Sequence, residues 1–176
     1  MWIENVAADD IPHRFHHDCG DNSMLIQIRD HNCTWWPEPK HNFKERHFFV
    51  FDDIENGDHD SETKGITDEQ AKQLVELLKH AKQNCMNVVV HCFAGICRSG
   101  AVVEIGTMMG FNDVGKFRQP NVRVKGKMMK VLGWSYDSTE DERRQSEFHI
   151  ANHILQRIYD QEAARVDKPL IITKGV

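Results

Sequence analysis

Residues 87–100 have the sequence NVVVHCFAGICRSG. The opening residues, Asn87 to Val90, form a short apolar run that is typical of a buried strand. Residues 99–109 can form a helix, so the residues between them are predicted to turn from strand to helix. Such a turn gathers backbone N–H groups at a helix N-terminus, where the unpaired donors and the helix dipole both favour an anion. The stretch therefore predicts a phosphate-binding loop at the end of a strand.

This loop contains a potential nucleophile and a fixed positive charge. Five residues separate Cys92 from Arg98, so one short loop can hold a thiolate and a guanidinium at the same phosphate. The loop N–H groups, the helix N-terminus and Arg98 all favour the thiolate, so Cys92 is the predicted nucleophile. Arg98 is predicted to bind two phosphate oxygens and to follow their charge in the transition state. Ser99 is placed to donate a hydrogen bond to the sulfur when it leaves, and Gly95 lets the backbone approach the ligand.

The same residues resemble the signature of a known family. His91-Cys92, Gly95 and Arg98-Ser99 match HCxxGxxRS, the CX5R phosphate loop of cysteine-dependent protein tyrosine and dual-specificity phosphatases, in every fixed position. The apolar strand before the motif and the helix-compatible segment after it supply the context that the motif requires. The detailed resemblance extends from about residue 47 to residue 110 and is closest to small bacterial or phage members.

The resemblance implies an activity and a set of binding residues. It implies a phosphomonoester hydrolase that acts through a phosphocysteine intermediate, on protein phosphotyrosine or alternatively on phosphoserine and phosphothreonine. His91 is expected to orient the loop rather than to titrate in catalysis. The expected phosphate-binding residues are Phe93, Ala94, Gly95, Ile96, Cys97 and Arg98.

This family also takes a general acid from an aspartate upstream of the nucleophile. Residues 46–51 are predicted to form a strand, and a polar loop follows them. Asp53 is the expected acid, because its Phe-x-Asp-Ile pattern resembles the acid position in small bacterial members. Asp52 is the nearest alternative, followed by Asp58 and Asp60, which lie in the same loop and closer to the nucleophile in sequence.

A second stretch superficially resembles an acid loop. Trp36-Pro37-Glu38 is similar to the Trp-Pro-Asp loop of the larger tyrosine phosphatases. It lies too far upstream, before the strand at residues 46–51, so it is expected to form a rigid turn with exposed aromatic side chains.

The remaining pattern alternates strands and helices. Residues 1–6 and 23–28 are predicted strands, and Thr67 and Gln70 have the spacing of a capping box that begins a helix ending near Asn84. Another helix is predicted from Pro120-Asn121 to Leu132. A longer one begins at Ser138 or Thr139. The apolar residues on one face of that last helix are Phe148, Ala151, Leu155 and Ile158.

This alternation predicts a single α/β domain over residues 1–176. The expected architecture is a three-layer α/β/α domain of the protein tyrosine phosphatase type, with a mainly parallel sheet of about four strands. The phosphate loop is expected at the C-terminal end of one strand. A chain of 176 residues is long enough for one core.

Composition restricts the expected location and partners. The net charge of −5 argues against general binding to nucleic acid or to anionic membranes. No run approaches the roughly 18 apolar residues of a membrane span, and the first residues lack a basic segment followed by an apolar one. Five cysteines without framework spacing, one of them a predicted thiolate, favour a reducing compartment. We therefore expect a soluble, cytoplasmic enzyme whose partner is a phosphorylated protein or peptide, while the oligomeric state is not encoded.

Two further groups of side chains were weighed as sites. One contains metal-ligating residue types but follows no standard zinc spacing, so no metal and no other cofactor is expected. Cys97 is expected to pack as a small apolar side chain, with a reversible redox partnership with Cys92 as the alternative. Cys85 is the other candidate for that partnership. The metal-capable residues are His13, His16, His17, Cys19, His31 and Cys33.

Other classes of protein fit the loop less well. The loop has no Lys, which weighs against phosphoinositide and 5′-triphosphate RNA substrates, and sulfurtransferases usually have a shorter spacing between Cys and Arg. The remaining alternative is a catalytically weak or inactive pseudophosphatase that binds phosphoproteins. Such a protein would be expected to have lost Cys92, Arg98 or the acid.

Overall fold

The computed structural model describes residues 1–13, 19–54 and 63–166. Its centre is a five-stranded sheet in the order β3-β2-β4-β1-β5, in which every pair of neighbours is parallel. The α/β class is confirmed, and the sheet has one strand more than expected because a two-residue segment pairs with the start of β1. The strands are β1 (Trp2–Ala7), β2 (Ser23–Arg29), β3 (Glu45–Val50), β4 (Asn87–Cys92) and β5 (Asn112–Asp113).

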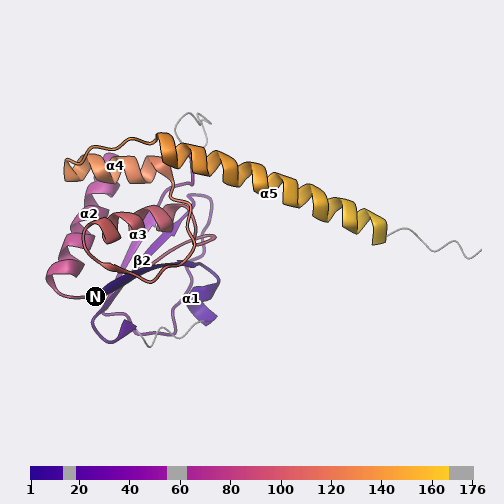
Figure 1. Cartoon of the computed structure of the whole chain (residues 1–176). Helices are drawn as coiled ribbons and strands as arrows, with labels where there is room; N and C mark the ends of the chain where they lie inside the picture. Colours follow the sequence, from indigo (N-terminus) through magenta and orange to yellow (C-terminus); the bar gives the residue numbers. More distant parts are fainter. Residues whose placement is uncertain (14–18, 55–62, 167–176) are drawn as a thin grey trace, which may run out of the picture.

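Helices α2 (Asp68–Gln83), α3 (Arg98–Met108) and α4 (Val122–Leu132) cover one face of the sheet (Figure 1). The short α1 (Asp10–His13) lies on the other face with the connecting segments. Side chains alternate between the faces of a strand, so Val88 and Val90 pack in the larger core with α2, α3 and α4, whereas Val89 packs beside Ile11 of α1. This arrangement is compatible with a three-layer α/β/α domain.

The start of α2 is built as the capping box predicts. The Thr67 hydroxyl accepts a hydrogen bond from the Gln70 N–H at 3.1 Å, and the Gln70 side chain accepts one from the Thr67 N–H at 2.9 Å. Gln70 Nε2 also donates to the carbonyl of Val50 at 3.0 Å. The helix start therefore supports the end of β3, directly before the aspartates that were considered as the acid.

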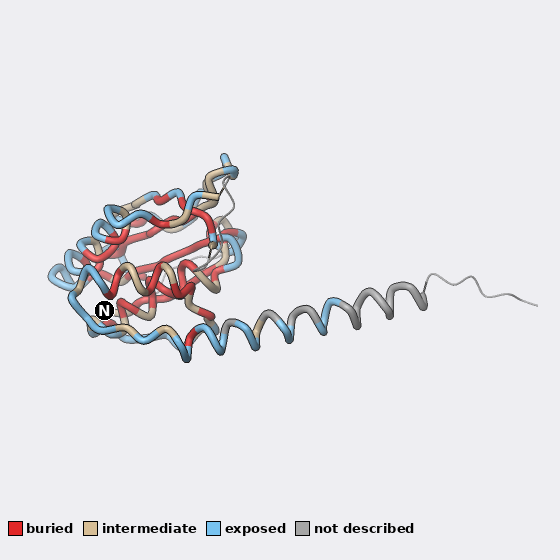
Figure 2. Tube along the Cα trace, turned by 90° about the horizontal axis from the view of Figure 1, so that it is seen from above, coloured by how far each residue is buried: buried red, intermediate tan, exposed pale blue. Residues whose placement is uncertain are grey.

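The last helix, α5 (Thr139–Val166), extends away from the body of the molecule (Figure 1). Its first turn is anchored by Asp141, which accepts hydrogen bonds from Lys125 and from the hydroxyl of Tyr136. Farther along, Leu155 is exposed. Figure 2 shows the same for most residues of this helix whose burial is described. Of the apolar face predicted for this helix, Phe148 contacts Phe117 and Ala151 is exposed like Leu155; the side chain of Ile158 lies outside the described part. Among residues 1–13, 19–54 and 63–166, no helix combines the length and apolar character needed to cross a bilayer.

Candidate active site

The segment from Cys92 to Arg98 is a turn from strand to helix, as predicted. Cys92 is the last residue of β4 and Arg98 is the first residue of α3. Four loop carbonyls accept hydrogen bonds from surrounding segments, and the N–H of a trans peptide unit points away from its carbonyl. The N–H groups of these peptide units therefore point away from the segments that contact their carbonyls. The donor–acceptor pairs are Ala8 N to Phe93 O (3.0 Å), Asn5 Nδ2 to Gly95 O (2.7 Å), Gln119 N to Ile96 O (3.3 Å) and Asn121 N to Cys97 O (3.1 Å).

Gly95 fits this loop for two separate reasons. Its φ is +71°, and a Cβ atom there would lie 2.3 Å from the carbonyl carbon of Val6 in β1. Gly115 has a similar φ of +74°, but a Cβ on it would meet nothing within 4 Å. Both positions require a left-handed backbone, but only Gly95 would also bring a Cβ atom into contact with neighbouring backbone.

We expect Gly95→Ala to lower the free energy of unfolding by more than Gly115→Ala does. Gly115→Ala introduces only the strain of a left-handed residue, about 1–3 kcal/mol. Gly95→Ala adds a contact with rigid backbone and should also lower activity, because the loop must shift. Denaturant unfolding of both variants checks the difference. Equal losses would show that the contact with Val6 relaxes without cost.

Cys92 lies beside the residue predicted to assist it. Its side chain is buried, and its sulfur lies 3.2 Å from the hydroxyl oxygen of Ser99, which is also buried. At this distance the hydroxyl can donate to a thiolate. The structure therefore brings Cys92 and Ser99 together as expected.

His91 is held in its neutral form behind the loop. Burial, together with the nearby charge of Arg98, lowers the pKa of His91 to about 4. Gln27 accepts from Arg46 through Oε1, so its Nε2 is the donor to His91 Nε2 at 3.0 Å. The imidazole ring of His91 is thus neutral, buried and fixed by the amide of Gln27, which fits the expectation that it orients the loop.

Arg98 is held by a residue that the sequence did not indicate. Its two terminal nitrogens donate to the two carboxylate oxygens of Asp30, at 2.9 and 3.1 Å, and Nη1 also donates to the carbonyl of Phe51 at 2.9 Å. Burial opposes the charge on Arg98, but Asp53, Cys92 and Asp30 outweigh it and raise the pKa of the guanidinium. Arg98 is therefore a permanent cation in a fixed orientation.

These contacts leave one edge of the guanidinium unused. Arginine has five N–H donors, of which Asp30 and Phe51 take three, so Nε–H and one hydrogen of Nη2 remain. Nε is buried and makes no hydrogen bond within the described part of the chain. Buried donors are normally paired, and this edge has the geometry that binds two oxygens of one phosphate. The unpaired donor therefore supports phosphate binding by Arg98.

The structure distinguishes the neighbouring aspartates. Asp53 Oδ2 lies 3.6 Å from Arg98 Nε, and the Asp53 side chain is 34% exposed. Asp52 is buried and points elsewhere, accepting hydrogen bonds from Lys64 N, from His31 N and from the His31 ring. Burial opposes ionisation of Asp52, but these hydrogen bonds outweigh it and lower its pKa. Asp53 is therefore placed at the site and Asp52 holds neighbouring backbone; the alternatives Asp58 and Asp60 lie outside the described residues.

Sequence reasoning missed Asp30 and Asn121. Asp30 directly follows β2 and meets Arg98, 68 residues later in the chain. Asn121 caps α4 and donates to Asp53 Oδ1 at 2.8 Å. A polar residue just after a buried strand was a signal for Asp30, because the ends of parallel strands share one edge of the sheet. The sequence around Asn121 predicts only the start of a helix, which gives no signal for its contact with Asp53.

The Trp-Pro-Glu segment is irregular backbone that is held by contacts to β2 and β3. Arg29 lies 4.5 Å from the Trp36 ring centroid, Gln27 donates to the carbonyl of Pro37 at 3.0 Å, and Glu38 pairs with Arg46 at 2.9 Å. The expected turn is not found at residues 36–38, and Trp36 is partly buried against Arg29 and Phe48, whereas the neighbouring Trp35 is exposed.

The metal-capable residues have separate surroundings. Cys19 is buried in the smaller core and His31 binds Asp52, while His16 and His17 lie outside the described residues. No group of three metal-ligating side chains gathers within the described ranges.

The two cysteines weighed as redox partners differ in position. Cys85 precedes β4, whereas Cys92 ends this six-residue strand, so the strand length of roughly 3.3 Å per residue separates them. Cys85 is therefore wrong as a direct partner of Cys92. Cys97 lies in the loop itself, as the residue before α3.

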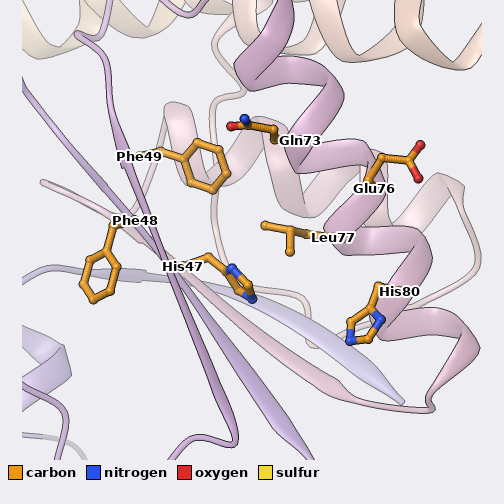
Figure 3. A pocket seen from close by; sticks show the side chains of 7 residues that line it. All are labelled: His47, Phe48, Phe49, Gln73, Glu76, Leu77 and His80. Atoms are coloured by element: carbon orange, nitrogen blue, oxygen red, sulfur yellow. The ribbon is translucent and has the colours of Figure 1, made fainter.

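One hollow in the surface adjoins the loop, and a second, wider one lies away from it. A narrow one of about 20 Å³ adjoins the loop and is lined by Asp30, Trp35 and Phe93 among others. A wider one of about 530 Å³ lies between β3 and α2 and is lined by His47 and His80 among others (Figure 3). Both histidines contact Glu45. The lining of this wider hollow contains no Lys or Arg, so it lacks the fixed cation of a phosphate site.

Comparisons with known proteins assign no family. No protein-family model and no curated protein matches the chain. The functional assignment therefore depends on the residues of the loop and on the contacts around them.

Proposed function

We propose that this chain is a cysteine-dependent phosphomonoester hydrolase, similar to protein tyrosine and dual-specificity phosphatases. The observation that supports this most strongly is the loop between β4 and α3. It holds a buried Cys92 near an Arg98 whose Nε–H makes no hydrogen bond within the described residues. Asp53 Oδ2 lies 3.6 Å from that Nε, within ion-pair distance but too far for a hydrogen bond. Nucleophile, phosphate ligand and acid are thus available at one place.

The reaction would proceed in two displacements at phosphorus. The thiolate of Cys92 attacks the phosphorus atom, a sulfur–phosphorus bond forms, and the ester oxygen leaves with a proton from Asp53. Water then attacks the phosphocysteine and gives its proton to Asp53, while Ser99 donates a hydrogen bond to the departing sulfur. Inorganic phosphate is released and the residues return to their starting states. The scheme uses no metal or other cofactor.

Exposed aromatic side chains favour phosphotyrosine as the substrate. Phe93, next to Cys92, is 74% exposed, and Trp35 is 50% exposed. Both line the narrow hollow beside the loop. Large exposed apolar groups at a phosphate site can contact the ring of an aryl phosphate, which a phosphoserine side chain lacks.

The deciding experiment measures release of inorganic phosphate from phosphotyrosine and phosphoserine peptides. The proposal expects multiple turnovers, faster with phosphotyrosine, in the presence of a metal chelator. A pseudophosphatase would bind the peptide without releasing phosphate. Binding with no turnover under these conditions would therefore overturn the assignment as an enzyme.

We expect Trp35→Ala to reduce the preference for phosphotyrosine. Loss of an aromatic contact of about 0.5–1.5 kcal/mol should lower kcat/KM for a phosphotyrosine peptide by about two- to tenfold. The value for phosphoserine should change little. Trp134→Ala is the matched control, because Trp134 is also partly exposed but does not line the hollow. Equal effects on both substrates would show that Trp35 does not contact the substrate ring.

A further inference from the structure

Asn121 is a fully buried polar residue that joins three parts of the candidate site. Its side-chain oxygen accepts a hydrogen bond from Val124 N at 2.9 Å, which caps α4. Its backbone N–H donates to the carbonyl of Cys97 at 3.1 Å, at the end of the phosphate loop. Its side-chain Nδ2 donates to Asp53 Oδ1 at 2.8 Å and to the carbonyl of Ile54 at 3.1 Å. Of the side-chain contacts, the bond to Val124 N is the helix cap, and the two bonds from Nδ2 exceed what a cap requires.

The contact with Asp53 selects one oxygen of the carboxyl group. Oδ1 faces the Nδ2 donor of Asn121, whereas Oδ2 lies 3.6 Å from Arg98 Nε. An amide N–H can only donate, so a proton on Oδ1 would face another proton. Oδ2 accepts no hydrogen bond from Arg98 Nε, which is 3.6 Å away, so the protonated form of Asp53 carries its proton on Oδ2.

Asn121 also limits movement of an otherwise accessible side chain. Asp53 is 34% exposed and follows the end of β3, so its carboxyl group has room to rotate. Asn121 is rigid by comparison, since its own oxygen is fixed to the α4 backbone. The same residue binds the phosphate loop, which fixes the acid relative to the loop that would hold the phosphate.

We propose that Asn121 is the positioning residue for the general acid, holding Asp53 so that Oδ2 presents the proton to the leaving oxygen. This inference rests on the proposed phosphatase function. It assigns Asn121 no contact with the substrate. It also explains why one residue contacts the acid, the phosphate loop and the start of α4.

Asn121→Ser tests the proposal because it separates the two roles of the side chain. Serine is a good helix cap, so its hydroxyl can still accept from the α4 backbone, but it cannot reach Asp53 as Nδ2 does. We expect kcat for phenyl phosphate, whose leaving group needs a proton, to fall about 10–10²-fold, the scale of a misplaced catalytic group. The rate with 2,4-dinitrophenyl phosphate should stay within about twofold, since that leaving group departs unprotonated.

A double variant and a matched control distinguish a general loss of structure from a change in the position of Asp53. Asp53→Asn combined with Asn121→Ser should be no slower on phenyl phosphate than Asp53→Asn alone, because both remove the same proton transfer. Asn87→Ser is the control: it removes side-chain bonds to Trp2 N and Cys19 O, near the other end of β4. It should lower stability without changing the ratio of the two rates.

Three outcomes are distinguishable. A selective loss on phenyl phosphate that does not add to Asp53→Asn supports the proposal. Equal losses on both substrates, or full additivity with Asp53→Asn, would reduce Asn121 to a helix cap and overturn it. Absence of turnover in the unmodified protein would instead reject the proposed function itself.

Discussion

Cys92→Ser is expected to abolish phosphatase turnover while the fold and the binding of phosphate remain. Serine preserves the shape of the side chain, so the buried position beside Ser99 can accept it without a clash. Its hydroxyl is hardly ionised near neutral pH, so the variant lacks the thiolate that attacks phosphorus. Release of phosphate from an aryl phosphate measures the loss, and thermal unfolding together with vanadate binding measures what is retained.

Cys85→Ser is the control for this prediction. Cys85 is exposed and lies before the start of β4, at the opposite end of the strand from Cys92. Its replacement should leave turnover within about twofold, as is usual for a surface substitution. Near-normal activity in Cys92→Ser would remove Cys92 from the mechanism, whatever the control shows.

Much of the fold was predictable because its signals are local. The apolar run Val88 to Val90 is buried in β4, and the capping box of Thr67 and Gln70 begins α2 where expected. Asn121 caps α4 and Gly133, with a φ of +69°, ends it. Each of these depends on residues within a few positions of one another.

Other parts depend on contacts between distant segments. β5 has two residues, too few to show any periodicity, and exists because it pairs with Trp2 and Ile3. The apolar residues of α5 are only weakly segregated to one face, so the sequence does not determine whether another element lies beside the face that carries Leu155. The order of the strands likewise follows from crossovers rather than from any one strand.

The candidate site also contains residues that are close because they share one motif and residues that meet only because distant segments come together. Cys92, Arg98 and Ser99 lie within one motif, so their proximity follows from the loop. Asp30 could not be paired with Arg98 from sequence, because that requires β2 and β4 to be neighbours in the sheet. The choice of Asp53 over Asp52 came from a resemblance. The structure supports it physically, since adjacent residues past the end of a strand point in different directions.

Asp53→Asn should lower kcat by roughly 10²–10⁴-fold for phenyl phosphate, the usual range for one acid/base residue. The amide keeps the shape of the side chain, and its oxygen can still accept from Asn121, so the loss reports the missing proton rather than a moved residue. Activated aryl phosphates should be affected less. The pH profile supplies a second measurement: the acid must be protonated when the ester oxygen leaves, so kcat of the unmodified enzyme falls as pH rises. That fall should disappear in the variant.

Asp52→Asn is the matched comparison, because it makes the same chemical change one residue away. Hydrogen bonds from Lys64 N and His31 lower the pKa of Asp52 despite its burial, so its charge stabilises the folded state above its ordinary titration range. That stability is lost as pH falls through the lowered pKa. The variant should therefore unfold more easily near neutral pH, while the dependence of kcat on the leaving group stays as in the unmodified enzyme. If Asp52→Asn removes the high-pH fall in kcat and Asp53→Asn does not, the acid is Asp52, and the contact between Asp53 and Asn121 serves only to hold the loop.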